Sequence, residues 1–334
     1  MDKNRFTIHE MTKLNDIKVS VLCTAYNHAP YLKQCLDGFV MQKTNFRFEV
    51  IINDDASTDD SASIIAQYEA NYPDLIKPIY QKVNQYSQKI DLYQTILFPK
   101  MKGQYVAICE GDDYWTDPYK LQKQVDILDA EKECVLVYTN FNTYQQESKE
   151  LKPFKFVFKE GAVHNELLAS KCTIQTLTIM FRCECLKGMP TLDPNVYFLG
   201  DLLWYCWLTQ LGNVRAIPEP TAVYRKLKNS ASHFTDIKHK IKLFYLCSNT
   251  RLYFLNKEDP QKRSPYGPRI RKKAAIWQFR YSLVTDDFDL YQRIKMPFSP
   301  ILTFNKLKYY FLFKRCHSEL VFHKEALRYS QFRK

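Results

Sequence analysis

Two adjacent carboxylates, Asp112 and Asp113, lie just after an apolar run at residues 105–109, with Glu110 between the run and the pair. The run predicts a buried strand, and α/β proteins place their chemistry at the carboxyl ends of strands. Neighbouring carboxylates repel each other, so a fold keeps such a pair where a cation or a polar ligand shares the site. The alternative is a solvated acidic turn, because residues 116–118 (Thr-Asp-Pro) form a good helix start.

Two earlier predicted strands also end in polar residues. The first ends in Cys-Thr-Ala-Tyr-Asn at residues 23–27, and the second in Asn-Asp-Asp-Ala-Ser-Thr-Asp at residues 53–59. If the strands are parallel, three loops converge on one edge of the sheet and bring together an aromatic ring, backbone groups and several carboxylates. That combination suits a nucleotide bound with a divalent cation. For Asp54 and Asp55 the alternative is a helix-capping turn.

The elements that must position these loops alternate along the first 140 residues. Alternation of strands and helices predicts a mostly parallel sheet flanked by helices, an α/β fold. Strands are predicted at residues 19–24, 48–52, 75–80, 105–109 and 134–139, and helices at 31–41, 60–70, 92–101 and 120–131. Residues 141–165 are polar and irregular; a strand at 174–181 and a helix at 202–211, closed by Gly212, are predicted to follow.

Composition sets limits on the class of protein. With 334 residues and 46% hydrophobic content, the chain can bury a large core. No apolar run is long enough to span a bilayer, and residues 1–18 lack the apolar core of a signal peptide, so we expect a cytoplasmic protein. The 10 Cys include no CxxC spacing, which predicts reduced, structural thiols.

The net charge of +12 is unevenly distributed. Residues 226–334 hold 24 Lys and Arg against 8 Asp and Glu, or +16, and the remaining residues sum to −4. We therefore predict a domain boundary near residue 230 and a basic, aromatic-rich helical extension after it. Such a segment indicates an anionic partner, unless it is simply a solvated helical surface.

Several nucleotide and metal motifs are absent from the sequence. There is no GxxxxGK[ST] loop, no GxGxxG and no HExxH, so the sequence argues against a P-loop kinase, a dinucleotide-binding enzyme and a zinc protease. Without a phosphate-cradling loop, a cation must neutralise the phosphates. This makes the acidic pair central to the interpretation.

In their order along the chain, these motifs resemble the family-2 glycosyltransferases of the GT-A fold, of the bacterial polysaccharide-biosynthesis type. The resemblance rests on residues 19–27, 54–59, 110–113 and 200–201, and extends over about residues 17–230. It implies a GT-A, Rossmann-like nucleotide-sugar domain over residues 1–230, followed by the basic extension at 231–334. The ordered set is specific, whereas each motif alone would be weak.

The resemblance also implies roles for individual residues. Those expected at the nucleotide are Thr24, Ala25, Tyr26, Asn27, Asp54, Asp55, Asp112 and Arg225. Asp55 would accept a hydrogen bond from the imide of the base, and Arg225 would contact the donor phosphates. Asp113, with Asp112 toward the ribose or the metal, would bind Mg²⁺ or Mn²⁺ on the diphosphate, and Asp201 would be the catalytic base.

The sequence departs from the family pattern at several positions, among them residues 226–230, which lack the histidine expected after Arg225. Glu110 stands where Asp is commoner, and Gln85 stands where a glycine is expected, which weakens the loop at residues 82–89 as a donor contact. Ala56 replaces a usual glycine, so we expect no positive φ in that turn.

The function implied is an inverting, metal-dependent transfer of a sugar from a nucleotide-diphosphate donor, a UDP-sugar, to a glycan or lipid-linked acceptor in cell-surface polysaccharide synthesis. The basic segment at residues 235–334 would hold the enzyme peripherally on the inner face of the membrane, with candidate anchors at 238–253, 269–281 and 306–315. Two alternatives remain: a sugar nucleotidyltransferase, and a nucleic-acid-binding protein that uses the basic segment. For the leading function no nucleic acid is expected as a partner.

Overall fold

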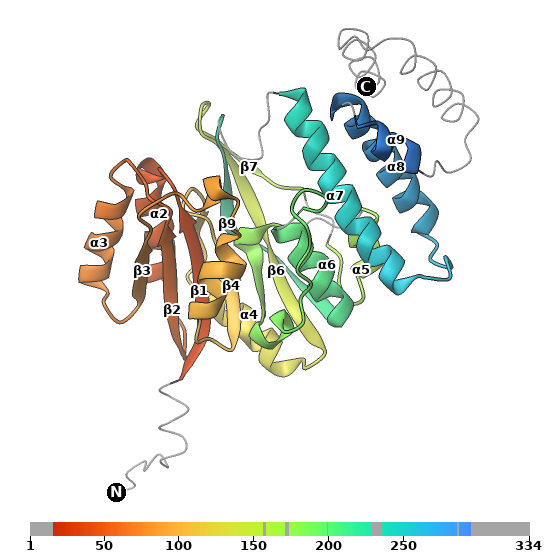
Figure 1. The fold of residues 1–334 in the computed structure, drawn as a ribbon. Helices are drawn as coiled ribbons and strands as arrows, with labels where there is room; N and C mark the ends of the chain where they lie inside the picture. Colours follow the sequence, from red (N-terminus) through yellow and green to blue (C-terminus); the bar gives the residue numbers. More distant parts are fainter. Residues whose placement is uncertain are drawn as a thin grey trace, which may run out of the picture. The chain divides into compact units, whose positions relative to one another are not determined.

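The computed structural model describes residues 16–155, 158–170, 174–198, 200–228, 236–285 and 287–294. The chain folds as two compact units (Figure 1). Unit 1 contains Met1–His164, Cys172–Pro190 and Trp207–Ser230, and unit 2 contains Asn165–Lys171, Thr191–Cys206 and Ala231–Lys334.

Unit 1 is built on one mixed sheet, which in the described residues has nine strands in the order β3-β2-β1-β4-β8-β6-β9-β5, with β7 paired to β6. The strands are β1 (Ile17–Ala25), β2 (Arg47–Asp54), β3 (Ile76–Tyr80), β4 (Tyr105–Ile108), β5 (Tyr114–Trp115), β6 (Cys134–Gln145), β7 (Glu150–Pro153), β8 (Ile179–Arg182) and β9 (Asn213–Lys226). The four strands β3, β2, β1 and β4 are parallel, and β8 joins them in the antiparallel sense. The predicted α/β class is confirmed.

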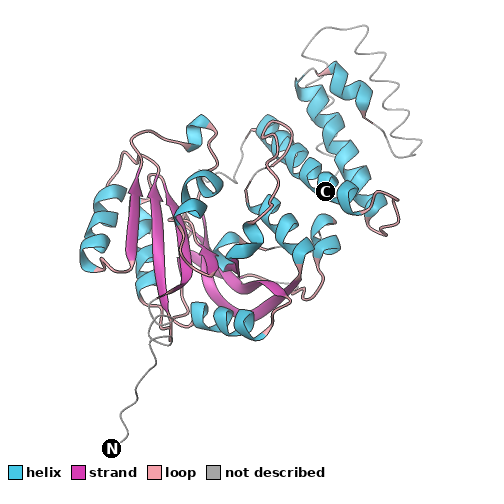
Figure 2. Cartoon of the chain, turned by 60° about the horizontal axis from the view of Figure 1, so that its bottom comes forward, coloured by secondary structure: helices cyan, strands magenta, loops and turns pink. Residues whose placement is uncertain are grey.

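Helices flank this sheet (Figure 2). They are α2 (Ala29–Val40), α3 (Ser61–Asn71) and α4 (Lys120–Ala130), and Pro30 stands in the first turn of α2. Alternate β1 residues, such as Val19 and Val21, pack in one apolar core with Leu36 of α2 and Leu121 of α4. The period of about 3.6 residues thus buries one face of each helix, whereas the centre of β1 is buried on both faces.

Three predicted segments differ from the structure. Residues 92–101 form a π-helical turn, Tyr93–Leu97, and a 3-10 turn, Phe98–Lys100, instead of an α-helix, and Pro99 cannot donate the bond that an α-helix needs there. The strand predicted at 174–181 begins with a 3-10 turn, Thr176–Thr178, before β8. The segment predicted to be irregular from residue 141 contains the end of β6 and all of β7.

Lys120, the first residue of α4, is fully buried. Its Nζ donates to Gln124 Oε1 at 2.6 Å and lies 4.5 Å from the centre of the Trp115 ring. Burial lowers the pKa of Lys120 to about 7. The folded chain therefore releases a proton that the unfolded chain keeps up to about pH 10, so this lysine makes the free energy of unfolding rise with pH between these two values.

Replacing Lys120 by Met should remove that contribution. The parent protein is expected to gain a few kcal/mol of unfolding free energy, relative to Lys120→Met, between about pH 7 and pH 10. Urea unfolding of both proteins across this range measures the difference. The control is Lys132→Met, which replaces an exposed lysine. The unfolding free energies of this variant and the parent should differ by the same amount at every pH. A constant difference for Lys120→Met as well would contradict the shifted pKa.

Unit 2 is helical in the residues that the structure describes. It contains α7 (Ile237–Glu258), α8 (Gly267–Thr285) and α9 (Phe288–Arg293), most of α5 (His164–Leu168) and the first half of α6 (Asp201–Leu211). Stacked aromatic pairs join α7 to α8: Phe244 with Trp277, and Tyr245 with Tyr281. These helices include the predicted anchors at 238–253 and 269–281, whereas the one at 306–315 lies outside the described residues.

Among the described residues, no helix combines the length and the apolar character needed to cross a bilayer. The eight cysteines that the structure describes are free. Burial raises the pKa of several of their thiols, among them those of Cys109 and Cys206, to about 12.

Candidate functional site

The loops after β1, β2 and β4 meet at the carboxyl edge of the parallel strands. Ala25 pairs with Asp54 across β1 and β2, and the Asp55 N–H donates to the Ala25 carbonyl at 2.9 Å. On the other side of β1, the Gly111 N–H donates to the Thr24 carbonyl at 2.9 Å. Within unit 1, the structure thus brings together the three polar loops that the sequence predicts at one edge of the sheet.

The loop after β1 presents both exposed and anchored groups. Tyr26 is 44% exposed and available to a planar ligand. Asn27 has a φ of 55°, and its Oδ1 accepts from the Thr58 N–H at 2.8 Å. Thr24 Oγ1 lies 3.5 Å from the hydroxyl of Tyr93. The amide of Asn27 therefore fixes the β1 loop against the β2 loop.

The expectation for Ala56 is wrong, because its φ is 60°. The backbone in this turn adopts the left-handed conformation that glycine occupies without cost, and here a residue with a Cβ accepts it. The adjoining Ser57 hydroxyl accepts from the Asn27 N–H at 2.9 Å, so the turn is held by the neighbouring loop.

Asp54 and Asp55 are both buried. The two carboxylate oxygens of Asp55 accept from the backbone N–H groups of Gln85 and Tyr86, at 2.8 and 3.0 Å. Each oxygen keeps a second lone pair for a ligand. Asp54 Oδ1 is buried and has no hydrogen-bond partner in the described residues. Gln85 thus contributes its backbone N–H to the site, although a glycine was expected there.

The acidic pair is asymmetric. Asp113 is 2% exposed, whereas Asp112 is half-buried. Asp113 Oδ1 accepts from the Arg225 backbone N–H at 2.7 Å, which fixes the orientation of the carboxylate. Burial, followed by the charges of Asp112 and Glu110, raises the pKa of Asp113 well above its usual range. Glu110 itself accepts from the Thr176 hydroxyl at 3.0 Å.

Arg225 of β9 is buried beside this pair. Its Nε donates to the Asp112 carbonyl at 2.8 Å, and its two terminal nitrogens donate to Gln146 Oε1 and Gln34 Oε1 at 2.8 and 2.6 Å. The guanidinium also lies about 5 Å from the ring centres of three tyrosines, Tyr31, Tyr114 and Tyr144. These contacts make Arg225 a central support of the acidic loop, and its contact with donor phosphates stays a prediction.

Arg225→Met should destabilise unit 1 by about 2–4 kcal/mol, because it removes three hydrogen bonds of a buried charge and leaves their acceptors without a donor. Urea unfolding measures the loss. Arg215→Met is the matched control: Arg215 lies on the same strand, but its partners Glu131 and Glu160 form exposed ion pairs. Equal losses in the two variants would show that the buried network around Arg225 adds nothing.

Asp201 belongs to unit 2 and begins α6. Its Oδ1 accepts from the Leu202 N–H at 2.6 Å. Burial raises the pKa of Asp201, while the Leu202 N–H and the charge of Arg251 act in the opposite direction. The carboxylate is therefore a stronger proton acceptor than an ordinary exposed aspartate, and its role as catalytic base stays a prediction.

Sequence reasoning missed one residue of the site, His28. It follows Asn27 directly and lies at the start of α2, and a Cβ at Gly111 would come within 2.9 Å of its Nδ1. Burial lowers the pKa of His28, while the carboxylates of Asp112 and Asp59 raise it. Its position next to Asn27 was the available signal, but a single histidine beside a helix start has no specific meaning without the fold.

The chemistry of the acidic loop fits a hard divalent cation. Asp112 and Asp113 offer only oxygen donors, and a cation would stabilise the charged form of Asp113 against burial and the repulsion of its neighbours, which raise its pKa. Across the described part of the chain, no group of three or more His, Cys, Asp or Glu side chains could hold a metal ion by itself. A cation at this pair would thus need further oxygens from a ligand, as a nucleoside diphosphate would supply.

Comparison with known proteins agrees with this geometry. Residues 20–185 match the family model described as "Glycosyl transferase family 2". An uncharacterised protein of Mycobacterium tuberculosis is 33% identical over 224 residues, covering 65% of this chain and 62% of its own. The chain thus spans less than two thirds of the length of that relative.

Two further proteins are similar. The Escherichia coli protein named UDP-Glc:alpha-D-GlcNAc-diphosphoundecaprenol beta-1,3-glucosyltransferase WfaP is 29% identical over 183 residues, covering 54% of this chain and 68% of its own. The crystal structure of S. aureus TarS 1-349 in complex with UDP-GlcNAc superposes with a TM-score of 0.56 at 16% identity, covering 84% of this chain and 76% of that one. The second likeness shows the GT-A fold. Through residues 20–185, the chain belongs to glycosyl transferase family 2.

Proposed function

We propose that this chain is an inverting, metal-dependent glycosyltransferase that moves a sugar from a UDP-sugar to a glycan or lipid-linked acceptor in cell-surface polysaccharide synthesis. The observation that carries the proposal is the meeting of the β1, β2 and β4 loops, which places Asp55 and the pair Asp112-Asp113 at one edge of the sheet. Membership of family 2 and the name of WfaP, which specifies a UDP-sugar and a diphosphoundecaprenol-linked acceptor, support it.

The proposed donor site uses the loops as follows. Tyr26 and Thr24 contact the base, Asn27 and Ala25 shape the loop around it, and a free lone pair of Asp55 accepts from the imide N–H. Asp54 lies beside Asp55 with an oxygen that has no partner among the described residues. Asp113 and Asp112 would hold Mg²⁺ or Mn²⁺, which when bound neutralises charge on the departing diphosphate.

On the acceptor side, we assign the proton transfer to Asp201. Inversion requires one base that removes the proton of the acceptor hydroxyl as the sugar is transferred. The Leu202 N–H orients one oxygen of Asp201, and the second remains for the acceptor. We also propose that residues 1–230 form the donor-binding domain and that the basic segment 231–334 places the enzyme at an anionic membrane surface on the cytoplasmic side.

A panel of donors tests the function. The purified chain with Mn²⁺ should hydrolyse a UDP-sugar slowly without acceptor, and other nucleotide sugars more slowly still. Formation of a UDP-sugar and pyrophosphate from UTP and a sugar phosphate would instead identify a nucleotidyltransferase. If no nucleotide sugar is bound or hydrolysed and salt-sensitive binding of nucleic acid is found, the proposal is wrong.

A further inference from the structure

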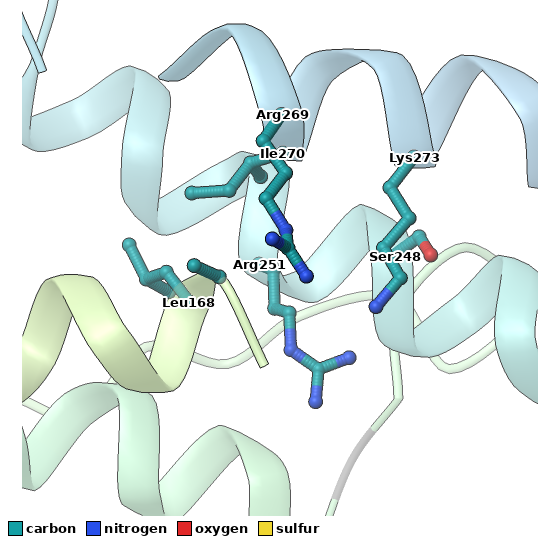
Figure 3. A pocket seen from close by; sticks show the side chains of 7 residues that line it. Leu168, Ser248, Arg251, Arg269, Ile270 and Lys273 are labelled. Carbon is teal, nitrogen blue, oxygen red and sulfur yellow. The ribbon is translucent and has the colours of Figure 1, made fainter. Parts of the chain in front are cut away.

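Unit 2 contains a small, open pocket lined by seven residues, none of which belongs to the acidic loop. Its walls come from the end of α5, from α7 and from the first turns of α8 (Figure 3). Three of the seven lining residues are cations: Arg251 of α7, and Arg269 and Lys273 of α8. Figure 3 shows their charged ends directed into the space between the helices.

None of the residues that line this pocket is acidic. Two carboxylates of unit 2 have other partners: Glu166 accepts from the Tyr266 hydroxyl at 3.3 Å, and Asp259 accepts from the Ser264 N–H at 3.0 Å and faces Arg271. Asp201 lies within electrostatic range of Arg251 but does not line the pocket. Three positive charges gathered around one pocket repel each other. An anion in the pocket would attract all three cations and so offset their mutual repulsion.

The hydrogen-bonding groups of the pocket also point to an anion. The Nε of Arg251 is buried and has no acceptor among the described residues. A buried N–H without an acceptor is costly, and a charged one more so. Lys273 Nζ donates to the Ser170 hydroxyl at 3.3 Å, and the Ser248 hydroxyl adds a neutral donor to the lining. An oxyanion with several oxygens could accept from all of these groups.

We propose that this pocket binds a phosphate or diphosphate group. Three cations exceed what one carboxylate needs, whereas a phosphate ester or a diphosphate carries two or more negative charges. The planar guanidinium groups of Arg251 and Arg269 suit phosphate oxygens, which they can contact with two parallel bonds. The apolar side chains of Leu168 and Ile270 adjoin the cations, so the pocket can also take a hydrocarbon next to the phosphate.

The position of Arg251 connects the pocket to the proposed chemistry. Its charge lowers the pKa of Asp201, against the effect of burial, so the two groups lie within electrostatic range inside unit 2. If the function proposed above holds, one source of the phosphate is a lipid-linked acceptor. Its diphosphate would bind in the pocket, and Asp201 would deprotonate its acceptor hydroxyl. The other source is a free phosphate or pyrophosphate. Both present the same chemistry to the three cations.

Calorimetric titration of the full chain with pyrophosphate tests the site. EDTA is present, so that no cation can recruit pyrophosphate to the acidic loop. The wild type should bind with a Kd at or below about 1 mM. Arg269→Ala and Lys273→Ala should each weaken binding by about tenfold or more, since each removes a charged donor to the ligand. Lys272→Ala, which removes the same charge from an exposed neighbour on α8, should change the Kd less than about twofold.

A parallel titration with farnesyl diphosphate separates the two sources. Tighter binding than pyrophosphate, with the gain lost in Ile270→Asp, supports the diphosphate site and assigns it to an isoprenoid-linked ligand. Equal binding supports the site and assigns it to the free anion. Two results would overturn the proposal: no binding of pyrophosphate by the wild type, or equal Kd values for Arg269→Ala and Lys272→Ala. The second result would do so even if the two variants differ in melting temperature. Donor hydrolysis, measured separately, shows whether the proposed function has failed as well.

Discussion

Replacing Asp113 by Asn is expected to lower kcat of sugar transfer by about 10³-fold, which corresponds to about 4 kcal/mol of transition-state stabilisation. The neutral amide keeps the size of the side chain and an oxygen that can accept from the Arg225 N–H, so the acidic loop should keep its shape. What is lost is the negative charge that a cation on the diphosphate requires. Initial rates with a UDP-sugar and increasing Mn²⁺ measure the effect.

A direct binding measurement separates loss of metal from loss of fold. Asp113→Asn should weaken Mn²⁺ binding in the presence of UDP, as followed by electron paramagnetic resonance, while thermal unfolding stays close to that of the parent. Asp126→Asn provides the matched control: it changes an exposed carboxylate on α4 that accepts only from the Gln122 amide. Full activity in Asp113→Asn would remove Asp113 from the metal site and leave Asp112 and Glu110 to be tested.

The fold could be predicted where local patterns agree with burial. The first five predicted strands are present as β1, β2, β3, β4 and β6. In β1, β2, β4 and β6 the signal is a continuous apolar run, which is typical of strands covered on both faces, whereas β3 is a partly exposed edge strand. The short β5 has only two residues and carries no periodic signal. β9 contains Pro218 and Pro220, which argue against a strand locally, and its long pairing with β6 shifts register near these prolines.

The site could be predicted only in part, for a related reason. Adjacent residues such as Asp112 and Asp113 are visible in the sequence, and their strand-end position follows from the apolar run before them. The partners of Arg225 are not visible, since Gln34 and Gln146 lie 191 and 79 residues away along the chain. The backbone N–H groups that Asp55 accepts from carry no sequence signal at all. Long-range hydrogen bonds of this kind have to be read from the structure.

Asp201, at the start of α6, is the proposed catalytic base. Asp201→Asn should lower kcat by about 10³-fold, because an amide cannot accept the proton of the acceptor hydroxyl. Asn keeps an oxygen for the Leu202 N–H and favours a helix start, so α6 should be preserved. Binding of UDP, measured by calorimetry, should be unchanged. In this respect Asp201→Asn should differ from Asp113→Asn, which weakens binding of UDP with the cation.

The pH dependence gives an independent test of the base. A base must be deprotonated to act, so kcat/KM of the parent should fall as the pH drops through the raised pKa of Asp201. That acid limb should disappear in the residual activity of Asp201→Asn and persist in Asp193→Asn, which alters an exposed aspartate of unit 2. A decrease in rate with an unchanged acid limb would mean that Asp201 positions the acceptor while another group takes the proton. Loss of UDP binding would instead mean that the substitution disturbs the donor site.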